Sequence, residues 1–535
     1  MNRKTFLKYL GFGALTAGMA PSLVFCGPDK KTNRIEPSLS PSADFLPDVE
    51  LDLIARETEV QVLPGKPTRV FTFTGELRKG DKQQLKPQNG SWLGPEIHLN
   101  KGQKVRIYFT NELQQESIIH WHGFHLPPEM DGHPMYAVGK EKTYVYEFTV
   151  QDKAGTYWYH PHPNKITGHQ VYHGLAGMLI VHDEKEEALG FPSGEFDQSL
   201  VIQDRTFNQD NQLVYDRDRR MTRMFGFMGE EILVNGKMDY QIDVAQGGYR
   251  LRILNGSNAR IYKIAWSDNM PVIVIATDGG FLEKPNPKPY MMLSPGERIE
   301  IWRNFKGIPA GKTLSLISKS FEDGTEMGGG PSGGGQMHGR MSPGMSSGNG
   351  REFHLMKFNI TGRIAHSFEL PSTLTQIQRL DPYKADNIGD PRDFYFFNKR
   401  MNWVINGRTF DMTGVSDEET VKLGTTEIWR FINGSPGGMS RMMSGRMKIP
   451  HPVHIHGLQF NIIQRDTSGM KEYVWNSVKD GFLDEGWQDT FLLMPDMKVQ
   501  VIMTFARYTG IYMYHCHNLE HEDMGMMRNY KVEYK

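Results

Sequence analysis

Short segments in which apolar and polar residues alternate run through most of the chain. In segment 104–110 the apolar residues Val105, Ile107 and Phe109 stand two positions apart, and segment 144–150 repeats this spacing. Alternation with a period of two sends apolar side chains to one face of a β-strand. Turn residues such as Gly, Pro and Asn separate the segments, and no long stretch of helical periodicity dominates. The pattern therefore predicts an all-β chain built from sandwiches or barrels.

One of these strand patterns occurs three times at the scale of whole domains. Segment 102–111 begins with Gly and ends with Asn, and segments 248–255 and 424–433 echo it. Such internal repeats indicate duplicated structural units. A length of 535 residues agrees with three units, because domains average roughly 150 residues. We expect domains at 45–190, 195–362 and 365–535.

The first 26 residues do not follow the strand pattern. A basic start with Arg3 precedes a short apolar run that ends at Cys26, as in an export signal. The start resembles a twin-arginine signal with Lys in place of the second Arg, and the run is too short and too glycine-rich to span a bilayer. We expect residues 1–26 to direct export to the periplasm or to the outer face of the cytoplasmic membrane, with Cys26 as a candidate lipid anchor. Cleavage near 18–20 is the alternative, and 27–44 is expected to be a linker.

Composition narrows the functional classes. The chain has 61 Lys and Arg against 62 Asp and Glu, so it lacks the basic excess that nucleic-acid binding requires. Two cysteines supply no disulfide framework. By contrast, 19 His and 31 Met are available, and these are residue types that bind transition metals. Composition therefore favours metal chemistry, and we expect a monomer without a nucleic-acid partner.

Two histidine motifs occur in the first and third copies and are missing from the second. One is His-X-His-Gly, and the other is Gly-X-Tyr-X-Tyr-His-X-His. Because alternate residues of a strand point the same way, each pair aims two imidazoles at one cavity. Eight imidazoles suit a cluster of three metal ions at the interface of the outer copies, and the second copy is then expected to be a spacer. Imidazole alone does not identify the metal. The eight residues are His120, His122, His160, His162, His454, His456, His515 and His517.

Cys516 distinguishes copper from the other metals that imidazole binds. It lies between two of these histidines, on the opposite face of their strand. His521 and Met526 follow it at five and ten residues, and His451 precedes the motif at 454. Two His, one thiolate and a weak axial Met form a blue-copper electron-transfer site. A lone buried cysteine is usually a small apolar side chain, but together with the histidine pairs this set favours copper.

The four motifs together resemble those of the multicopper oxidases, which include laccases, ascorbate oxidase and bacterial cuprous oxidases. They read His-Trp-His-Gly, His-Pro-His, His-Pro-Val-His-Ile-His-Gly and His-Cys-His-Asn-Leu-Glu-His-Glu-Asp-Met-Gly-Met, and the resemblance spans about 50–535. It implies three cupredoxin-like Greek-key β-sandwich or barrel domains and four copper ions per chain. The implied ligands are His451, Cys516, His521 and Met526 for type 1 copper, His120 and His454 for type 2, and His122, His160, His162, His456, His515 and His517 for the type 3 pair.

The resemblance also implies an enzyme. Donors would be oxidised by one electron at type 1 copper, and the electrons would pass through Cys516 to the cluster, where O2 is reduced to water. Protons must reach a buried cluster, and carboxylates can deliver them. Asp131 and Glu522 match acids that the family uses in this way. The alternative for each is a surface carboxylate or one that orients a ligand.

Methionine-rich segments bear on the electron donor. The insert 324–350 in the second domain is rich in Gly, Ser and Met, and a second cluster runs almost directly into His451. Thioethers select Cu(I), and the pattern resembles the Met-rich segments of bacterial cuprous oxidases. We therefore expect oxidation of Cu(I) to Cu(II) in copper detoxification, against the alternative of a flexible insert. The candidate substrate ligands are Met327, Met337, Met341, Met345, Met439, Met442, Met443 and Met447.

Two other functions stay open. A laccase-like oxidase of phenols and organic dyes would need an open apolar cleft over His451 and His521. A copper-binding or electron-transfer protein without oxidase turnover would not need the eight-histidine cluster. A further methionine group at 221–228 is explained equally well by helical packing.

Overall fold

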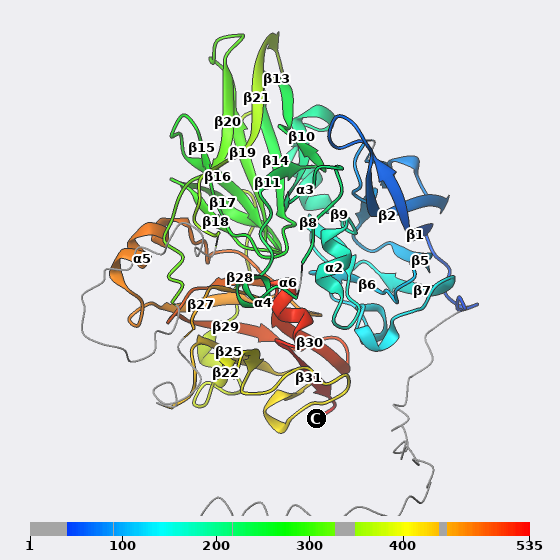
Figure 1. Ribbon diagram of the computed structural model, residues 1–535, viewed down its shortest axis with the longest axis vertical. Helices are drawn as coiled ribbons and strands as arrows, with labels where there is room; N and C mark the ends of the chain where they lie inside the picture. The colour runs from blue at the N-terminus through cyan, green and yellow to red at the C-terminus, as the bar shows by residue number, and fades with distance from the viewer. Residues whose placement is uncertain (1–39, 89, 217, 327–347, 438–446) are drawn as a thin grey trace, which may run out of the picture. The chain divides into compact units, whose positions relative to one another are not determined.

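The computed structural model describes residues 40–88, 90–216, 218–326, 348–437 and 447–535. The predicted export signal with Cys26 and most of the predicted linker lie outside these residues. The same holds for all the candidate substrate methionines except Met447. The described part is made of β-strands with a few short helices, which confirms the predicted all-β class (Figure 1).

The first two sheets come from the first copy. In β1, Val49, Leu51, Leu53 and Ala55 are fully buried, so the alternation in sequence places them on the core face. The first sheet has the order β2-β1-β5-β7, with β1 (Val49–Val60), β2 (Thr68–Lys79), β5 (Lys104–Asn111) and β7 (Lys142–Thr149). The second has the order β3-β4-β9-β8-β6, with β3 (Leu85–Lys86), β4 (Glu96–Asn100), β6 (Ile119–His122), β8 (Gly155–Pro161) and β9 (Gly177–His182).

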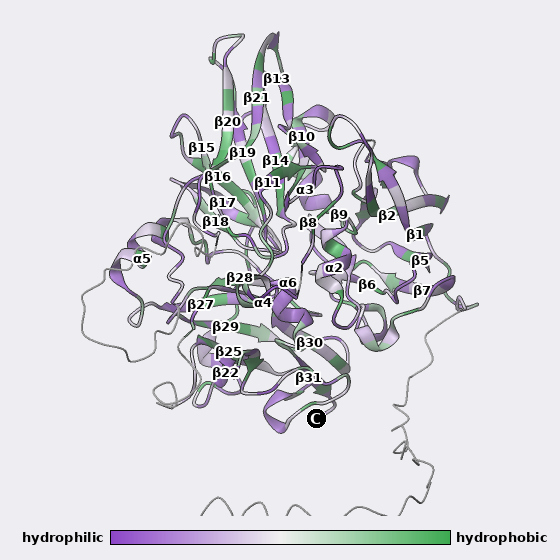
Figure 2. Ribbon diagram, in the orientation of Figure 1, coloured by the Kyte–Doolittle hydropathy of each residue, from purple (hydrophilic) through white to green (hydrophobic). Residues whose placement is uncertain are grey.

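The second copy forms two further sheets. One has the order β12-β11-β10-β14-β19-β16-β17, with β10 (Asp197–Arg205), β11 (Glu231–Val234), β12 (Lys237–Met238), β14 (Gly248–Asn255), β16 (Val272–Thr277), β17 (Gly280–Lys288) and β19 (Arg298–Asn304). The other has the order β13-β21-β20-β15-β18, with β13 (Gln241–Gln246), β15 (Tyr262–Trp266), β18 (Met291–Leu293), β20 (Thr313–Ser318) and β21 (Phe353–Ile364). Figure 2 shows hydrophobic and hydrophilic bands alternating along β13 and β21.

The third copy carries the last two sheets. One has the order β23-β22-β25-β29-β27, with β22 (Arg392–Lys399), β23 (Asn402–Ile405), β25 (Thr426–Asn433), β27 (Asn461–Asp466) and β29 (Lys498–Thr504). The other has the order β24-β31-β30-β26-β28, with β24 (Thr420–Lys422), β26 (His451–Ile455), β28 (Thr490–Leu493), β30 (Gly510–Cys516) and β31 (Met527–Glu533). Each copy is thus a pair of sheets around its own apolar core.

The repeated glycine-led strand occupies the same position in each copy. The three repeats are β5, β14 and β25, and each pairs in parallel with the first long strand of its copy. Each also pairs antiparallel with an equivalent later strand, β7, β19 or β29. The chain therefore folds as three cupredoxin-like domains. The exact domain bounds stay a prediction, and β21 runs to Ile364, two residues past the expected end of the second domain.

The helices are short and lie between strands. They are α2 (Thr167–Tyr172), α3 (Glu184–Leu189), α4 (Arg220–Phe225), α5 (Glu472–Val478) and α6 (Leu519–Asp523). The 3-10 turns are η1 (Lys82–Gln84), η2 (Pro128–Met130), η3 (Pro134–Tyr136), η4 (Gly194–Phe196), η5 (Pro382–Lys384), η6 (Asp417–Glu419) and η8 (Lys479–Gly481). Helix α6 of the third copy contacts α2 of the first and α4 of the second, so it joins all three (Figure 1). Within the described ranges, every helix is too short or too polar to span a bilayer.

Candidate metal centres

Strand pairing brings the eight motif histidines into one buried cluster. In the first copy, β6 pairs with β8 so that His120 stands opposite His160. In the third copy, β26 pairs with β30 so that His454 stands opposite His515. The second histidine of each motif lies two residues further along, and all eight side chains are fully buried. The duplicated motifs therefore face each other across the interface of the outer copies.

The facing nitrogens have the separation that ligands of one ion require. Nε2 of His120 lies 3.2 Å from Nε2 of His454, and Nε2 of His162 lies 3.4 Å from Nε2 of His515. Within the third copy, the Nε2 atoms of His456 and His515 are 3.0 Å apart. Two nitrogens at about 2.0–2.1 Å from one ion lie roughly 3 Å apart. Triads such as His162, His456 and His515 bring three ligand atoms within 4.8 Å of one another.

Backbone carbonyls fix the tautomers of half of the cluster. In four rings Nδ1 lies 2.6–3.1 Å from a backbone oxygen, so Nδ1 carries the hydrogen and Nε2 is left to bind a metal. These rings are His120, His160, His454 and His515. Neither ring nitrogen of His517 has a hydrogen-bond partner among the described residues, although the side chain is fully buried. Buried polar atoms are rarely left unpaired, so this ring fits a metal ligand.

The protonation state of the cluster also fits a metal. Burial lowers the pKa of all eight imidazoles, because the charged form loses its hydration. Neutral imidazole is the form that binds a transition metal. Eight neutral rings with converging lone pairs therefore match a multinuclear site.

Both carboxyl groups predicted to supply protons are buried and touch the cluster. Oδ2 of Asp131 lies 2.8 Å from Nδ1 of His456, and Oε2 of Glu522 lies 3.2 Å from Nδ1 of His515. Asp131 is 1% exposed and Glu522 is 2% exposed, which excludes the surface alternative for both. Burial raises the pKa of each carboxyl well above its usual range. Each group is thus placed to hold a proton directly beside a predicted ligand.

The middle copy contributes to this site, so the expectation that it serves only as a spacer is wrong. Asp489 of the third copy lies 3.0 Å from Nε2 of His122. Both Asp489 oxygens accept hydrogen bonds from Arg298 of β19, at 2.7 and 2.6 Å, and both side chains are fully buried. At Gly296 (φ +86°) a Cβ would lie 3.0 Å from the ring of His517. No sequence motif marked Asp489, Arg298 or Gly296, because their roles come from packing between copies.

A second cluster surrounds Cys516. Its Sγ lies 3.4 Å from Nδ1 of His451 and 3.7 Å from Nδ1 of His521. Nε2 of His521 lies 3.2 Å from the carbonyl oxygen of Met224, which leaves Nδ1 free to bind a metal. The fully buried Met526 accepts a backbone hydrogen bond from Cys516 and donates one to His521. The structure thus brings the four predicted residues into one core.

The protonation states of the residues around Cys516 also favour a bound metal. Burial raises the pKa of the Cys516 thiol and lowers that of His451 and His521. Without a metal, the thiol would be protonated between two neutral imidazoles, whereas metal binding deprotonates it. Strand β30 joins the two clusters, because His515 faces the histidine cluster while its neighbour Cys516 faces this core.

Described residues at the ends of the two methionine-rich segments contact each other and Met228. Glu326 and Lys448 exchange two backbone hydrogen bonds of 2.9 and 3.2 Å, three residues before His451. A Cβ at Gly348 would lie 3.2 Å from Sδ of Met228. Met224 is one of the buried methionines of the core around Cys516. The partly buried methionines that pack against this core are Met221, Met228, Met447, Met470 and Met524.

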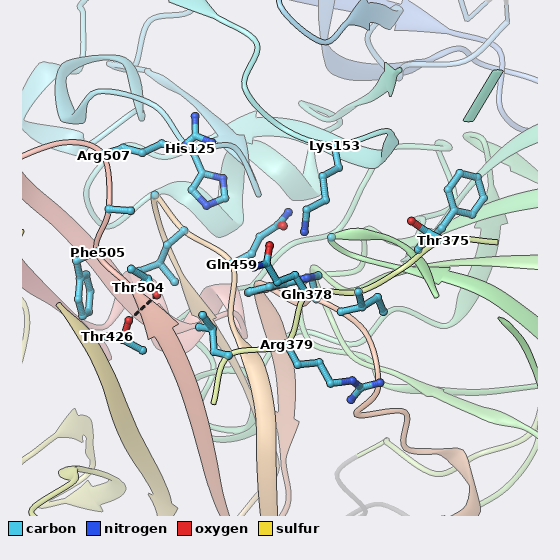
Figure 3. Close-up of a pocket in the computed structure, with 18 of the residues that line it drawn as sticks. His125, Lys153, Thr375, Gln378, Arg379, Thr426, Gln459, Thr504, Phe505 and Arg507 are labelled. Atoms are coloured by element: carbon cyan, nitrogen blue, oxygen red, sulfur yellow. Dashed lines mark hydrogen bonds between the residues drawn. The ribbon is translucent and has the colours of Figure 1, made fainter. Parts of the chain in front are cut away.

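A separate cavity of about 860 Å3 opens beside segment 457–459, which follows the His456 motif. Figure 3 shows His125, Lys153 and Gln459 around it. Its lining includes none of the predicted copper ligands. His451 and His521 are themselves fully buried, so no open cleft exposes them in the described structure.

Comparison with known proteins agrees with this geometry. Family models described as "Multicopper oxidase" match residues 72–186 and 381–535. The multicopper oxidase Mco of Staphylococcus aureus is 32% identical over 459 residues, which are 85% of this chain and 86% of the relative. The crystal structure of the multicopper oxidase McoA from Aquifex aeolicus is 32% identical with a TM-score of 0.74, over 91% of this chain and 97% of that chain.

A second solved structure is a multicopper oxidase from Campylobacter jejuni that is described as a metallo-oxidase. It is 26% identical with a TM-score of 0.70, over 93% of this chain and 94% of that chain. Together with the family models, these relatives identify the chain as a member of the multicopper oxidase family, which are oxidoreductases with copper cofactors.

Proposed function

We propose that this multicopper oxidase is a cuprous oxidase that takes electrons from Cu(I) and uses them to reduce O2 to water. When bound, the copper ions supply the one-electron transfers and the four-electron chemistry of O2. The proposed ligands are His451, Cys516, His521 and Met526 at type 1 copper, His120 and His454 at type 2, and His122, His160, His162, His456, His515 and His517 at the type 3 pair.

The spacing and the chemistry of the donors support this ligand set. Burial favours the neutral form of the imidazoles. Facing nitrogens lie 3.2 Å apart in one pair of rings and 3.0 Å apart in another, and those of His517 have no partner in the described chain. The thiol and the two imidazoles around Cys516 form the softer set that a blue copper site requires. Because His515 and Cys516 are neighbours on β30, electrons have a short covalent path between the sites.

The buried carboxyl groups are assigned to proton supply. Asp131 contacts the ring of His456 and Glu522 contacts the ring of His515, and burial raises the pKa of both carboxyls. Reduction of O2 to water consumes protons, and a positioned carboxyl can transfer them. Both side chains also orient the rings that they touch.

The single observation that carries the choice of Cu(I) is the set of contacts made by the described residues at the ends of the methionine-rich segments. Glu326 and Lys448, described residues at the ends of the two Met-rich segments, pair with each other, and Lys448 stands three residues before His451 in the sequence. Gly348 lies against Met228, close after helix α4, whose Met224 carbonyl lies 3.2 Å from Nε2 of His521. Thioethers stabilise Cu(I). The name of the Campylobacter jejuni metallo-oxidase agrees with a metal ion as donor.

The test is steady-state O2 uptake by the copper-loaded protein. Cu(I) is compared with a dimethoxyphenol, with and without added Cu(II). We expect fast uptake with Cu(I), and slow phenol oxidation that accelerates when copper is added. In the variant Met221→Leu with Met228→Leu, we expect the KM for Cu(I) to rise about fivefold or more without a change in phenol oxidation.

The control is Met270→Leu, because Met270 is 53% exposed in a turn of the middle copy and should have no effect. Efficient phenol oxidation without added copper, combined with sluggish Cu(I) turnover, would make the protein a laccase instead. Copper binding without O2 uptake from either donor would make it a copper-binding or electron-transfer protein.

A further inference from the structure

A pair of histidines lies outside both clusters. His98 is in β4 and His182 ends β9, two neighbouring parallel strands of the first copy. Nδ1 of His98 lies 3.0 Å from Nε2 of His182, and the two ring planes are inclined by only 8°. This separation lies within the range of 3.0–3.4 Å found between facing nitrogens of the eight-histidine cluster.

Each ring of the pair is oriented by its own carboxylate. Nε2 of His98 donates to Oε1 of Glu96 at 2.6 Å, and Nδ1 of His182 donates to Oε2 of Glu186 at 2.6 Å. A carboxylate on the outer nitrogen is the usual support of a metal-ligating histidine.

The inner nitrogens, Nδ1 of His98 and Nε2 of His182, then carry no hydrogen, so their lone pairs face each other. Two neutral imidazoles in these tautomers repel at 3.0 Å unless a proton lies between the two nitrogens, or a metal ion lies beside their axis at about 2.0–2.1 Å from each. A proton on one of the two facing nitrogens is the alternative, and it would make the pair a hydrogen bond. A metal ion satisfies both lone pairs without protonating either ring.

The surroundings leave room to complete a coordination shell. A cavity of about 540 Å3 is lined by both rings and by side chains of both charges. The side chain of His98 is 15% exposed and that of His182 is 36% exposed, so an ion can reach them from solvent. The charged groups that line the cavity are Asp48, Asp81, Glu96, Asp197, Lys86 and Arg252.

We propose that His98 and His182 bind one late first-row divalent cation, with Glu96 and Glu186 orienting the rings and water completing the shell. Nitrogen donors of this kind favour Cu2+ over Zn2+. Glu186 also forms ion pairs with Arg250 and Arg252 of β14, at 2.6 and 3.0 Å. Glu186 therefore links the ring of His182 in the first copy to β14 of the middle copy.

The test counts metal ions on the copper-loaded enzyme after weakly held metal has been removed with a chelating resin. Zn2+ serves as the probe in equilibrium dialysis, with metal analysis of both compartments. We expect the wild type to bind one more Zn2+ per chain than the double variant His98→Asn with His182→Asn. Glu96→Gln keeps an acceptor for His98 but loses the charge, and we expect its affinity at this site to fall about 10- to 100-fold.

The matched control is His366→Asn. His366 is also partly buried, but both of its ring nitrogens are taken by backbone groups of Gly248 and Phe368, so it should retain the extra Zn2+. Blue absorption and O2 uptake verify that each variant is folded, independently of the Cu(I) assignment. Equal Zn2+ binding by wild type and double variant, or an equal loss in His366→Asn, would overturn the proposal and leave a hydrogen-bonded pair that shares a proton.

Discussion

The outer copies and the middle copy differ in what their sequences show and in what their folds contribute. The outer copies carry every predicted copper ligand in recognisable motifs, and the middle copy carries none. The middle copy nevertheless supplies Arg298 to Asp489, the carbonyl of Met224 to His521 and the close approach of Gly296 to His517. The predicted copper ligands can thus be recognised from sequence motifs, whereas the groups that position them come from all three copies.

Among the variants that test this comparison, Arg298→Met in the middle copy is expected to have the largest effect, a loss of stability. The change leaves the Asp489 carboxylate fully buried without its cation, next to Asp278, which lies 3.3 Å from Arg298. Removing one partner of a buried ion pair costs about 3–5 kcal/mol. Denaturant unfolding should show this loss, and metal analysis should show less copper while blue absorption persists.

The control for that prediction is Arg363→Met. Arg363 pairs with Glu195 on the surface of the same copy, with both side chains about half exposed. Such an exposed pair contributes little to stability, because water and salt screen it. Equal unfolding free energies for the two variants would mean that the middle copy does not support the cluster.

A smaller effect, limited to turnover, is expected from Asp131→Asn in the first copy. The amide keeps an oxygen for Nδ1 of His456 but cannot deliver a proton. A lost proton donor slows a reaction about 100-fold or more. Reoxidation of the reduced enzyme by O2, followed by stopped flow, should slow by this factor, with blue absorption and copper content intact.

Asp152→Asn is the matched control for this change. Asp152 is buried, and its Oδ1 lies 2.5 Å from Nδ1 of His125, whose ring is not a predicted ligand. We expect normal reoxidation in this variant. Normal reoxidation in Asp131→Asn as well would show that Asp131 only orients His456.

The smallest effect is expected at His133, in the contact between the first and third copies, which we call the joint. Its ring is 1% exposed, accepts from the Met135 N–H at Nδ1, and donates to Asn529 of the third copy at Nε2. Burial lowers the pKa of His133 to about 4, against about 6.5 in the unfolded chain. The unfolded state therefore binds more protons as the pH falls from 6.5 toward 4, and stability is lost over that window.

Between pH 7.5 and pH 5 this group should cost the folded state about 2 kcal/mol. The variant His133→Gln removes that contribution, so its unfolding free energy should depend less on pH than that of the wild type. Denaturant titrations at both pH values measure the difference. An unchanged pH dependence would mean that this ring does not control the acid stability of the joint.

Much of the fold followed from local pattern. Alternation predicted strands such as β5 and β7, and the glycine-led repeat predicted that β5, β14 and β25 are equivalent, because both signals depend only on neighbouring residues. Sequence could not predict the contact between His98 and His182, because it depends on the parallel pairing of β4 with β9, 84 residues apart. The assignment of Met327, Met337, Met341, Met345, Met439, Met442 and Met443 stays a prediction.

The sequence by itself determined the family, the three-fold repeat and the residue types at the proposed copper sites. It did so because a His-X-His pair on a strand already fixes the direction of two rings. Only the tertiary structure decided which rings face each other, which nitrogen each ring leaves free, and that Arg298 of the middle copy holds Asp489 beside His122. Those features arise where separate sheets meet, and burial there sets both the pKa of each group and the partners it can reach.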